Sequence, residues 1–450
     1  MDQNSSSKKQ NLNEDKDIIS NLPDVIIGRI LSFLLTKEAV STCVLSKRWI
    51  YLWTFITKLN FNDRKLYYRT RISRTHFLNS VYRVLLNLDA STVQSFTLSL
   101  TKDYHSYHIN QWISAILNRG VKELLVESNK NLDISSYSLW KSQSLEKMVL
   151  NMHGCVIRVP TFVCLSSLTV LKLTRITFTC HPSNDSKILI LKFPVLREYE
   201  AENCSWLNVK DVTFEVPLLE VLSITPAYES VDSHTIIKFC APQLTKFSYS
   251  GCVSPISDTI LLDIDLSRAR IASANIYPRE YLQESEENAA SLTSQLLRQF
   301  NNNVECLKFE RSKVLALAKD DLPTFGMLTR LELGNVTGEI LMNFLQNTPF
   351  LKTFLLQELL QFDEALSNPE NVPSCIISNL EVFKFGKLYN IEHELRFAKF
   401  VMAYAQVLKV ASFSPRWDLR RSTFEKVKKK ILSFKRRVSS VVIEFPPVFK

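Results

Sequence analysis

Residues 168–173 read LTVLKL, and the same order of apolar positions returns as LEVLSI at 219–224 and as LTRLEL at 328–333. Each copy opens on an apolar residue, and apolar residues also fill its fourth and sixth positions. The interval from one opening residue to the next mostly lies between 23 and 29 residues, and the openings are Val93, Val121, Leu145, Leu168, Leu196, Leu219, Leu244, Val304, Leu328, Leu351 and Leu380. The 60-residue interval after Leu244 leaves room for one or two degenerate copies around Ile264 to Ile276.

A period of roughly 20 to 29 residues is typical of leucine-rich-repeat solenoids, in which each copy supplies one strand with a helix or irregular segment behind it. A helical protein rich in leucine would instead show a period of about 3.6 residues. The predicted fold class is therefore α/β, with the repeats over residues 93–375. Because side chains alternate along a strand, the leucines point inward and the residues between them face the concave surface.

The sharpest feature of this predicted concave surface is an acidic triplet. Glu198, Glu200 and Glu202 share one strand face, while Lys172 and Lys246 occupy outward positions of nearby copies. Carboxylates this close repel one another unless a cation lies beside them. Either neighbouring lysines such as Lys172 neutralise the triplet in water, or these five residues bind a basic segment of a target protein.

Residues 17–61 read DIISNLPDVIIGRILSFLLTKEAVSTCVLSKRWIYLWTFITKLNF and predict three short helices. Ser20 or Asn21 could cap the first helix, Thr36 the second and Ser46 the third. Ile26, Ile27, Ile30 and Leu31 cannot all face the interior of so small a unit. The surplus apolar residues either seal the end of a larger domain or form an exposed surface for a partner's helices.

This segment resembles a plant-type F-box. The resemblance rests on Leu22-Pro23-Asp24, Ile30 to Leu34, Thr36 to Val40, Val44 to Trp49 and Leu52-Trp53. It implies docking on a Skp-family adaptor, which joins F-box proteins to a cullin–RING ubiquitin ligase. The implied docking residues are Leu22, Pro23, Ile26, Ile30, Leu31, Leu34, Val44 and Leu45, with Trp49 and Trp53 in the core. Leu35 and Ile50 depart from the family pattern, which usually has Pro and a basic residue there.

Residues 376–450 predict a strand over 380–385, a helix through Leu395 and Ala405, a strand over 407–413 and a last strand over 440–445. Between the last two strands, Ser422 and Glu425 form a potential capping box at the start of another helix. This order is similar to the FBD domain of plant F-box/FBD/leucine-rich-repeat proteins. Seven basic residues between 426 and 437 could form a nuclear import signal, an anion-binding patch or the solvated side of that helix.

Five units are therefore expected: a disordered tail (1–16), an F-box (17–61), a helical linker (62–92), leucine-rich repeats (93–375) and an FBD-like domain (376–450). The resemblance implies a substrate-recognition adaptor of an SCF-type (Skp–cullin–F-box) E3 ubiquitin ligase. In that complex the F-box would bind the Skp-family adaptor and the repeats would bind a target protein. The alternative is a ligase-independent interaction scaffold, in which the N-terminal helices serve only as an end cap.

Catalysis by the chain itself is not expected. Phosphate-binding glycine motifs are absent, the seven histidines are scattered, and no metal site or cofactor is predicted. The nine cysteines form no C-x-x-C pair, which favours a reducing, intracellular compartment, nuclear or cytoplasmic. Neither a leader peptide nor a membrane span is predicted. The net charge of +10 suits an acidic partner, but only Phe434 lies among the 426–437 basic residues, so nucleic acid is not an expected partner.

Overall fold

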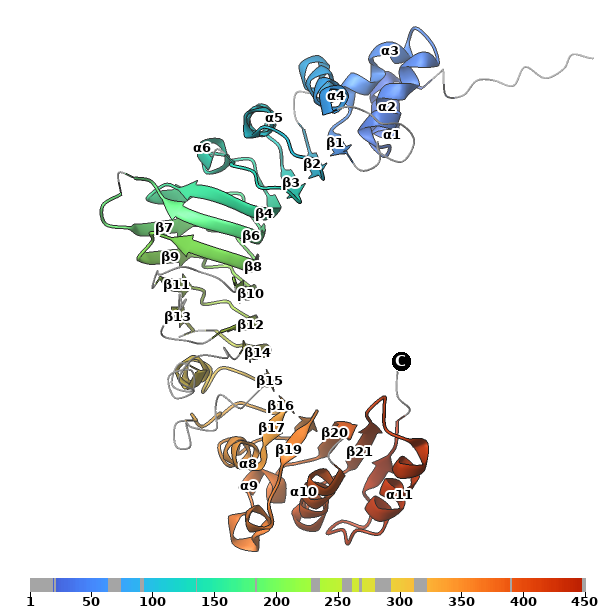
Figure 1. Ribbon diagram of the computed structural model, residues 1–450, viewed down its shortest axis with the longest axis vertical. Coiled ribbons are helices and arrows are strands. Elements are labelled where there is room, and N and C mark those ends of the chain that lie inside the picture. The colour runs from blue at the N-terminus through green and yellow to red at the C-terminus, as the bar shows by residue number, and fades with distance from the viewer. Residues whose placement is uncertain are drawn as a thin grey trace, which may run out of the picture.

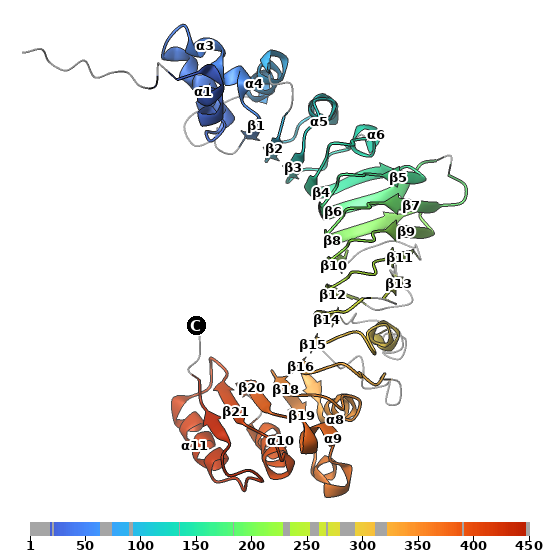
Figure 2. The same cartoon turned by 180° about the vertical axis from the view of Figure 1, so that it is seen from behind.

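The computed structural model describes residues 19, 22–63, 74–89, 93–134, 136–182, 184–227, 235–252, 261–266, 269–279, 293–310, 322–388 and 391–446. These residues form an open arc with a helical module at its N-terminal end (Figure 1). One long sheet follows the inner side of the arc, and helices and a second sheet follow its outer side, as both views show (Figures 1 and 2).

Within the described ranges the inner sheet has fifteen strands in chain order, and every neighbouring pair is parallel. Its strands are β1 (Lys58–Asn62), β2 (Ser95–Leu100), β3 (Glu123–Ser128), β4 (Lys147–Val159), β6 (Val170–Cys180), β8 (Glu198–Leu207), β10 (Val221–Pro226), β12 (Lys246–Cys252), β14 (Ser273–Arg279), β15 (Cys306–Glu310), β16 (Arg330–Gly334), β18 (Thr353–Leu356), β20 (Val382–Leu388), β21 (Val410–Pro415) and β22 (Val442–Glu444).

The described residues also form two smaller sheets. The second sheet has the order β13 (Leu261–Asp265), β11 (Ile236–Cys240), β9 (Asp211–Glu215), β7 (Ile188–Lys192) and β5 (Phe162–Cys164), and β17 (Val336–Thr337) pairs with β19 (Leu359–Gln361). The N-terminal helices are α1 (Asp24–Leu31), α2 (Thr36–Ser41), η2 (Thr42–Val44), α3 (Trp49–Leu52) and η3 (Trp53–Phe55). The later helices are α4 (Arg74–Asn87), α5 (Ser106–Asn118), α6 (Ser136–Leu139), α8 (Gly338–Gln346), η5 (Glu364–Ser367), η6 (Pro369–Asn371), α9 (Ser374–Ser378), α10 (Ile391–Tyr404) and α11 (Arg421–Leu432).

The apolar period explains the inner sheet. All eleven predicted opening residues have no exposed surface, and a strand of the inner sheet follows each of them. In the 60-residue interval the structure places one further copy, which opens on the buried Ile271 and continues into β14. Buried and half-buried residues alternate along strands such as β2 and β15 because successive side chains leave opposite faces of the sheet.

The longest strands turn a corner at a residue with left-handed backbone. Gly154, Arg175 and Asn203, on β4, β6 and β8, have φ angles of 80°, 56° and 52°. The β4–β6 pairing shifts register between Asn151 and Cys155, next to Gly154. Glycine and asparagine tolerate this conformation, whereas an arginine there is strained. The corner turns these strands away from the inner face.

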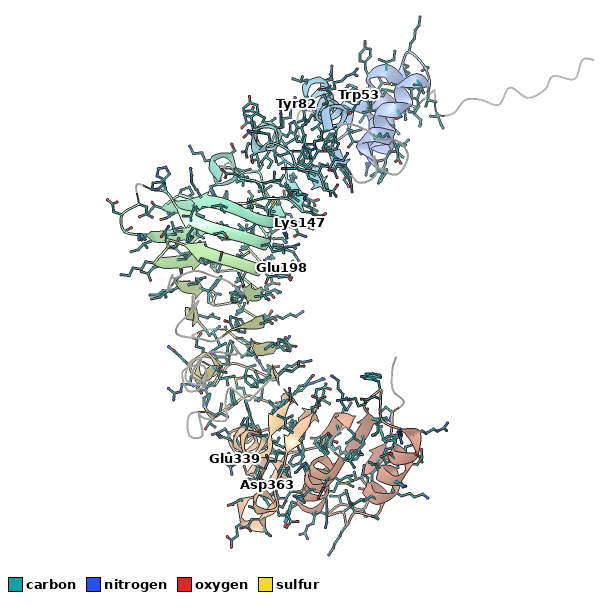
Figure 3. All side chains as sticks on the ribbon, viewed as in Figure 1. Trp53, Tyr82, Lys147, Glu198, Glu339 and Asp363 are labelled. Atoms are coloured by element: carbon teal, nitrogen blue, oxygen red, sulfur yellow. The ribbon has the colours of Figure 1, made fainter. Side chains whose placement is uncertain are left out.

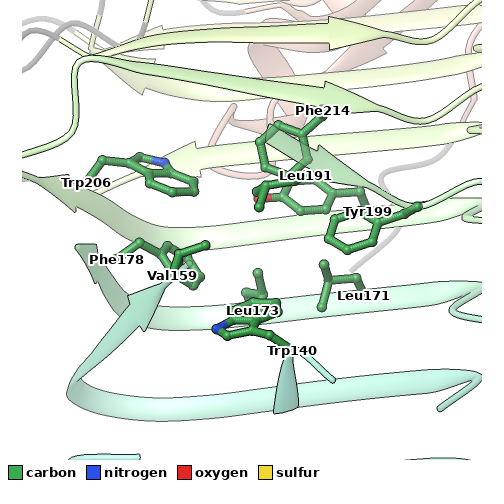
Figure 4. A pocket seen from close by; sticks show the side chains of 10 residues that line it. Trp140, Val159, Leu171, Leu173, Phe178, Leu191, Tyr199, Trp206 and Phe214 are labelled. Atoms are coloured by element: carbon green, nitrogen blue, oxygen red, sulfur yellow. The ribbon is translucent and has the colours of Figure 1, made fainter. Parts of the chain in front are cut away.

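Aromatic and aliphatic side chains fill the space between the two sheets. Phe214 and Phe239 stack with their ring centroids 4.5 Å apart. Figure 4 shows a gap beside Phe214, bordered by Trp140, Leu173, Tyr199 and Trp206. Its volume is about 10 Å³, at the lower limit for a single water molecule. This gap is therefore part of a packed core and too small for an organic ligand.

The inner sheet crosses two of the boundaries drawn from the sequence. β1 begins inside the segment 17–61 and pairs with β2, and β20, β21 and β22 of the segment 376–450 extend the same sheet. The predicted capping box at Ser422 is wrong, because α11 begins at Arg421, and the Glu425 carboxylate instead pairs with Lys428 at 2.8 Å. The predicted tail 1–16 and the caps Ser20 and Asn21 lie outside the described residues.

Candidate docking and target surfaces

The first helix of the N-terminal module carries apolar residues on two of its sides. Ile27 and Leu31, four residues apart, are almost completely buried. Ile26 and Ile30, also four residues apart, form a second apolar stripe that stays in solvent. An eight-residue helix in a small module can bury only one such stripe, so the second stays exposed to solvent.

Several neighbouring side chains extend the exposed stripe. Their exposed fractions are 43% for Ile26, 45% for Ile30, 40% for Leu34, 83% for Val44 and 64% for Leu45. Pro23 is also exposed and Leu22 is half-buried. Val25 and Phe33, which the sequence analysis did not name as docking residues, are 80% and 79% exposed. We call Pro23, Val25, Ile26, Ile30, Phe33, Leu34, Val44 and Leu45 the docking surface.

Ionic and hydrogen-bond contacts tie the two parts of this surface together. The Arg48 guanidinium, just before α3, pairs with the Asp24 carboxylate at 2.6 Å and donates to the Leu22 carbonyl oxygen. Asp24 is the first residue of α1, so the Val44–Leu45 segment lies near the start of that helix. A close contact also fixes α1 against η3, since a Cβ on Gly28 would lie 3.1 Å from the Phe55 Cβ.

Three sequence-based expectations in this module need correction. Ser46 was predicted to cap the third helix, but α3 begins at Trp49 and Arg48 is its N-cap residue. Leu31 was predicted to contact the partner but is 1% exposed, because it lies on the inner stripe of α1. Thr36 was predicted to cap α2, yet the helix begins at Thr36 itself and Leu35 precedes it as the N-cap residue. Trp49 is buried and Trp53 packs partly buried against the core, as predicted.

The buried Thr36 instead links the module to the inner sheet. Its hydroxyl oxygen accepts a hydrogen bond of 2.7 Å from the backbone N–H of Asn60 in β1. The Ser32 hydroxyl accepts a longer one, 3.4 Å, from the N–H of Thr57. β1 is the first strand of the sheet and its free edge would expose unpaired backbone groups. The module therefore covers this edge.

On the inner side of the arc, Lys172 neutralises part of the acidic triplet. Its ammonium lies 2.8 Å from the Glu198 carboxylate and 3.1 Å from that of Glu200. Hydrogen bonds and charge from these carboxylates outweigh the opposing effect of burial, and the hydrogen bond to Glu198 contributes most, so the pKa of Lys172 is raised. Glu202 and Lys246 are exposed, and no contact with an oppositely charged side chain joins either to the described chain. Figure 3 shows Lys147 and Glu198 on this inner side.

A second charged cluster lies further along the same face. The Lys308 ammonium is 2.8 Å from the Glu332 carboxylate and 3.3 Å from that of Glu310. The Gln357 side-chain amide donates to Glu332 at 3.0 Å. Lys308 also lies 5.8 Å from the centre of the Tyr277 ring. The inner face thus carries two groups of acidic residues, each held by one shared lysine.

Comparison with known proteins identifies one domain near each end of the chain. The F-box domain family model matches residues 19–57, and the FBD family model matches residues 368–413. The chain carries an F-box and an FBD. It is 28% identical to an F-box/FBD/LRR-repeat protein of Arabidopsis thaliana, over 89% of this chain and 93% of that protein. A second protein of that description and an FBD-associated F-box protein from the same plant are also 28% identical, over 90% and 88% of this chain and 90% and 92% of their own lengths.

The F-box match covers the whole docking surface and also the buried residues on the opposite side of α1. The FBD match covers α9, β20, α10 and most of β21, and α11 follows it. The homologous proteins are described by these domains and by leucine-rich repeats. Plant F-box/FBD/LRR-repeat proteins are therefore this chain's relatives along most of its length.

The described residues form no cluster suited to a metal ion. No group of three or more His, Cys, Asp or Glu side chains within them could hold a metal ion. Burial raises the pKa of the Cys155 thiol to about 11 and that of Cys204 to about 12, so both stay protonated and unreactive. The side chain of Cys252 is not among those described. Within the described ranges, no helix combines the length and apolar character that a membrane crossing needs.

Proposed function

We propose that this chain is the substrate-recognition subunit of an SCF-type E3 ubiquitin ligase. In this proposal the F-box binds a Skp-family adaptor, and the adaptor joins the chain to a cullin–RING ligase that supplies the ubiquitin-transfer chemistry. The arc of parallel strands is a leucine-rich-repeat solenoid, and its inner face binds the target protein. The proposal assigns no catalysis to the chain itself.

The observation that carries the proposal is the exposed apolar surface on α1 and η2. Monomeric soluble proteins rarely leave a contiguous apolar patch of this kind in water, and such patches mark partner sites. Here the patch lies inside the segment that the F-box model matches, and the stripe behind it is already buried in the module. A helical partner that packs on Ile26, Ile30 and Leu45 would remove these side chains from water.

The same module supports a second candidate, an end cap of a scaffold that acts without a ligase. The hydrogen bond from Asn60 to Thr36 and the buried Ile27 and Leu31 favour a capping role. The two roles use different sides of the module, because the cap contacts face β1 and the docking surface faces solvent. Capping is thus compatible with adaptor binding and does not replace it.

For target recognition, Glu202 and Lys246 offer charge that the described chain leaves uncompensated, whereas Glu198 and Glu200 share Lys172. A basic target segment would gain the most favourable electrostatic interaction from the carboxylate of Glu202. It would have to compete with Lys172 for the other two carboxylates. The predicted target set Glu198, Glu200, Glu202, Lys172 and Lys246 therefore remains a proposal, with Glu202 as its most available acidic member.

The docking surface is tested by comparing Leu45→Asp with Leu86→Asp. Leu45 lies on the docking surface, and Leu86 is a 79% exposed leucine on α4, outside the F-box. Burying a leucine is worth about 1.5 to 3 kcal/mol, and a buried carboxylate costs more, so Leu45→Asp should weaken adaptor binding at least tenfold. Leu86→Asp should bind as the wild type does. The measurement is the dissociation constant for a purified Skp-family adaptor, by calorimetry.

Both variants change exposed side chains, so each should unfold at the wild-type denaturant concentration. This check matters because a misfolded F-box would also lose binding. If Leu45→Asp folds and still binds the adaptor with wild-type affinity, the adaptor proposal is wrong and the scaffold alternative takes its place.

A further inference from the structure

The C-terminal end of the arc concentrates nearly all of the chain's excess positive charge. Residues 415–437 contain ten basic and two acidic residues, a net charge of +8, while the whole chain has +10. Seven of the basic side chains are exposed, and we call them the basic face: Arg420, Arg421, Lys426, Lys429, Lys430, Lys435 and Arg437. The rest of the chain is therefore close to neutral.

Several basic residues on other parts of the arc pair with carboxylates, whereas no such ion pair joins the basic face to the described residues. Lys122 pairs with Glu146, Lys409 with Glu381 and Arg270 with Glu305, at 2.5 to 2.8 Å. On α11 the Glu425 carboxylate pairs with Lys428, and this contact, with added charge from Arg421 and Lys429, lowers the pKa of Glu425. Among the described residues no acidic partner joins Lys426, Lys430 or Lys435.

An exposed tryptophan lies just before the basic face. The chain has six tryptophans, all among the described residues, and five of them are buried or half-buried. Trp417 is 81% exposed, and its ring makes no aromatic or cation contact within the described chain. It stands three residues before Arg420. An indole ring left in water beside arginines is suited to stacking against a flat ligand.

The loop that carries Trp417 is held on both sides. The Arg416 guanidinium donates to the Asp418 carboxylate through two nitrogens, at 2.8 and 2.6 Å. The Arg416 N–H donates to the Leu388 carbonyl oxygen, and the Leu419 N–H donates to the Arg416 carbonyl oxygen. A ring on such a fixed loop loses little freedom when a ligand binds.

We infer that Trp417 and the basic face together form a binding site for single-stranded nucleic acid. The α11 helix spans about 18 Å, so its exposed lysines can follow several successive phosphates. An unpaired base stacks on Trp417 while Arg420 and Arg421 contact the phosphates beside it. Proteins that bind single strands without sequence preference combine these two elements, a basic track and an aromatic platform.

The chemistry of this surface fits nucleic acid better than an acidic protein segment. Protein interfaces centre on apolar side chains and are depleted in lysine. Residues 415–437 expose only Trp417 and Leu432 as large apolar side chains, against seven basic ones. The sequence analysis considered only Phe434 as an aromatic partner of the lysines, and Phe434 is half-buried. Trp417 supplies the missing exposed ring.

The test measures binding of the full chain to a labelled 12-nucleotide oligouridine by fluorescence anisotropy over a range of salt concentrations. The wild type should bind, and its tryptophan fluorescence should be quenched. Trp417→Ala should weaken binding about 5- to 150-fold without changing the salt dependence, because stacking is not ionic. Trp417→Phe should retain much of the affinity.

The lysines are tested by the triple variant Lys426→Ala/Lys430→Ala/Lys435→Ala. For single strands the slope of log K against log salt concentration is about −0.7 for each phosphate contact, so losing three contacts should reduce it by about 2. The matched control is Lys37→Ala/Lys130→Ala/Lys238→Ala, which removes the same charge from exposed lysines elsewhere. The control should bind as the wild type does.

Two outcomes would overturn the inference. If the control triple weakens binding as much as the α11 triple does, the attraction depends on net charge alone and there is no site. If a polyglutamate peptide binds as tightly as the oligouridine and Trp417→Ala has no effect on either, the surface takes an acidic protein segment instead. The inference does not depend on adaptor binding, so the Leu45→Asp variant should bind the oligouridine normally.

Discussion

At the scale of single residues, Arg175 is the clearest case of a side chain in an unfavourable backbone conformation. Its φ of 56° lies in the left-handed region, which costs a residue with a Cβ roughly 1–2 kcal/mol. The corresponding corners on the neighbouring strands are filled by Gly154 and Asn203, which tolerate this region. The Arg175 side chain gains one exposed hydrogen bond, 3.1 Å from the Asn151 side-chain oxygen.

Arg175→Asn should therefore raise the free energy of unfolding by about 0.5 to 1 kcal/mol, because the relieved strain exceeds the value of one exposed hydrogen bond. Urea denaturation measures this change. The control is Arg158→Asn, at an exposed arginine of β4 whose φ is not positive, where no gain is expected. A loss of stability in Arg175→Asn would show that the strain argument does not hold at this corner.

At the scale of elements, the Lys308 cluster joins β15 to β16 across the inner face. Burial lowers the pKa of Lys308, but the hydrogen bond and charge of Glu332, with smaller effects from Tyr277 and Glu310, raise it more, so the net shift is upward. The Glu332 side chain is only 13% exposed, so water solvates its negative charge poorly and the charge of Lys308 has to balance it. Removing one partner of such a pair leaves a poorly solvated charge.

Lys308→Met should lower the free energy of unfolding by about 1 to 2 kcal/mol at neutral pH, as measured by urea denaturation. A raised lysine pKa stabilises the fold fully below the unfolded value of about 10.4, and this contribution fades as pH rises through the folded value. The difference from the wild type should thus be constant between about pH 7 and 9 and shrink above about 10.4. Lys246→Met, at an exposed lysine, should change stability by less than about 0.5 kcal/mol. An equal loss in both variants would contradict the assigned role of Lys308.

At the scale of the whole molecule, the F-box has two sides, and we propose a separate task for each. One side covers the first strand of a fifteen-stranded sheet, and the other presents the docking surface. Because the cap is packed on the sheet, the arc and the docking surface are held in one orientation. In the proposed ligase, this would fix where a target on the inner face lies relative to the adaptor.

Thr36→Val separates the two tasks. It removes the hydroxyl that accepts from the Asn60 N–H and leaves that group unpaired, so the free energy of unfolding should fall by about 1 to 2 kcal/mol. Affinity for the adaptor should stay unchanged, the reverse of the Leu45→Asp pattern. Thr97→Val, on the inner face of β2, serves as a control that should alter neither property. Weakened adaptor binding in a folded Thr36→Val variant would argue against separate sides.

The period of apolar residues was sufficient to place most of the inner sheet, because each copy must bury its own leucines against its neighbours. All eleven opening residues are buried, and the F-box and FBD were recognised from their motifs. The period did not identify Ile56 as the residue that opens the copy containing β1. Residues of a helical pattern surround Ile56 in the sequence and hide the motif. It also gave no sign of the second sheet, whose strands lie between the motifs.

The sequence by itself thus determined the repeats, the helical module and the residue types available for binding. Only the tertiary structure decided which apolar stripe of α1 turns inward, that Lys172 rather than a target neutralises Glu198 and Glu200, and that Trp417 stands in water. The physical reason is that periodicity fixes which side chains share a face of an element. Which face is buried, and which charge meets which, depends on elements that pack together from distant parts of the chain.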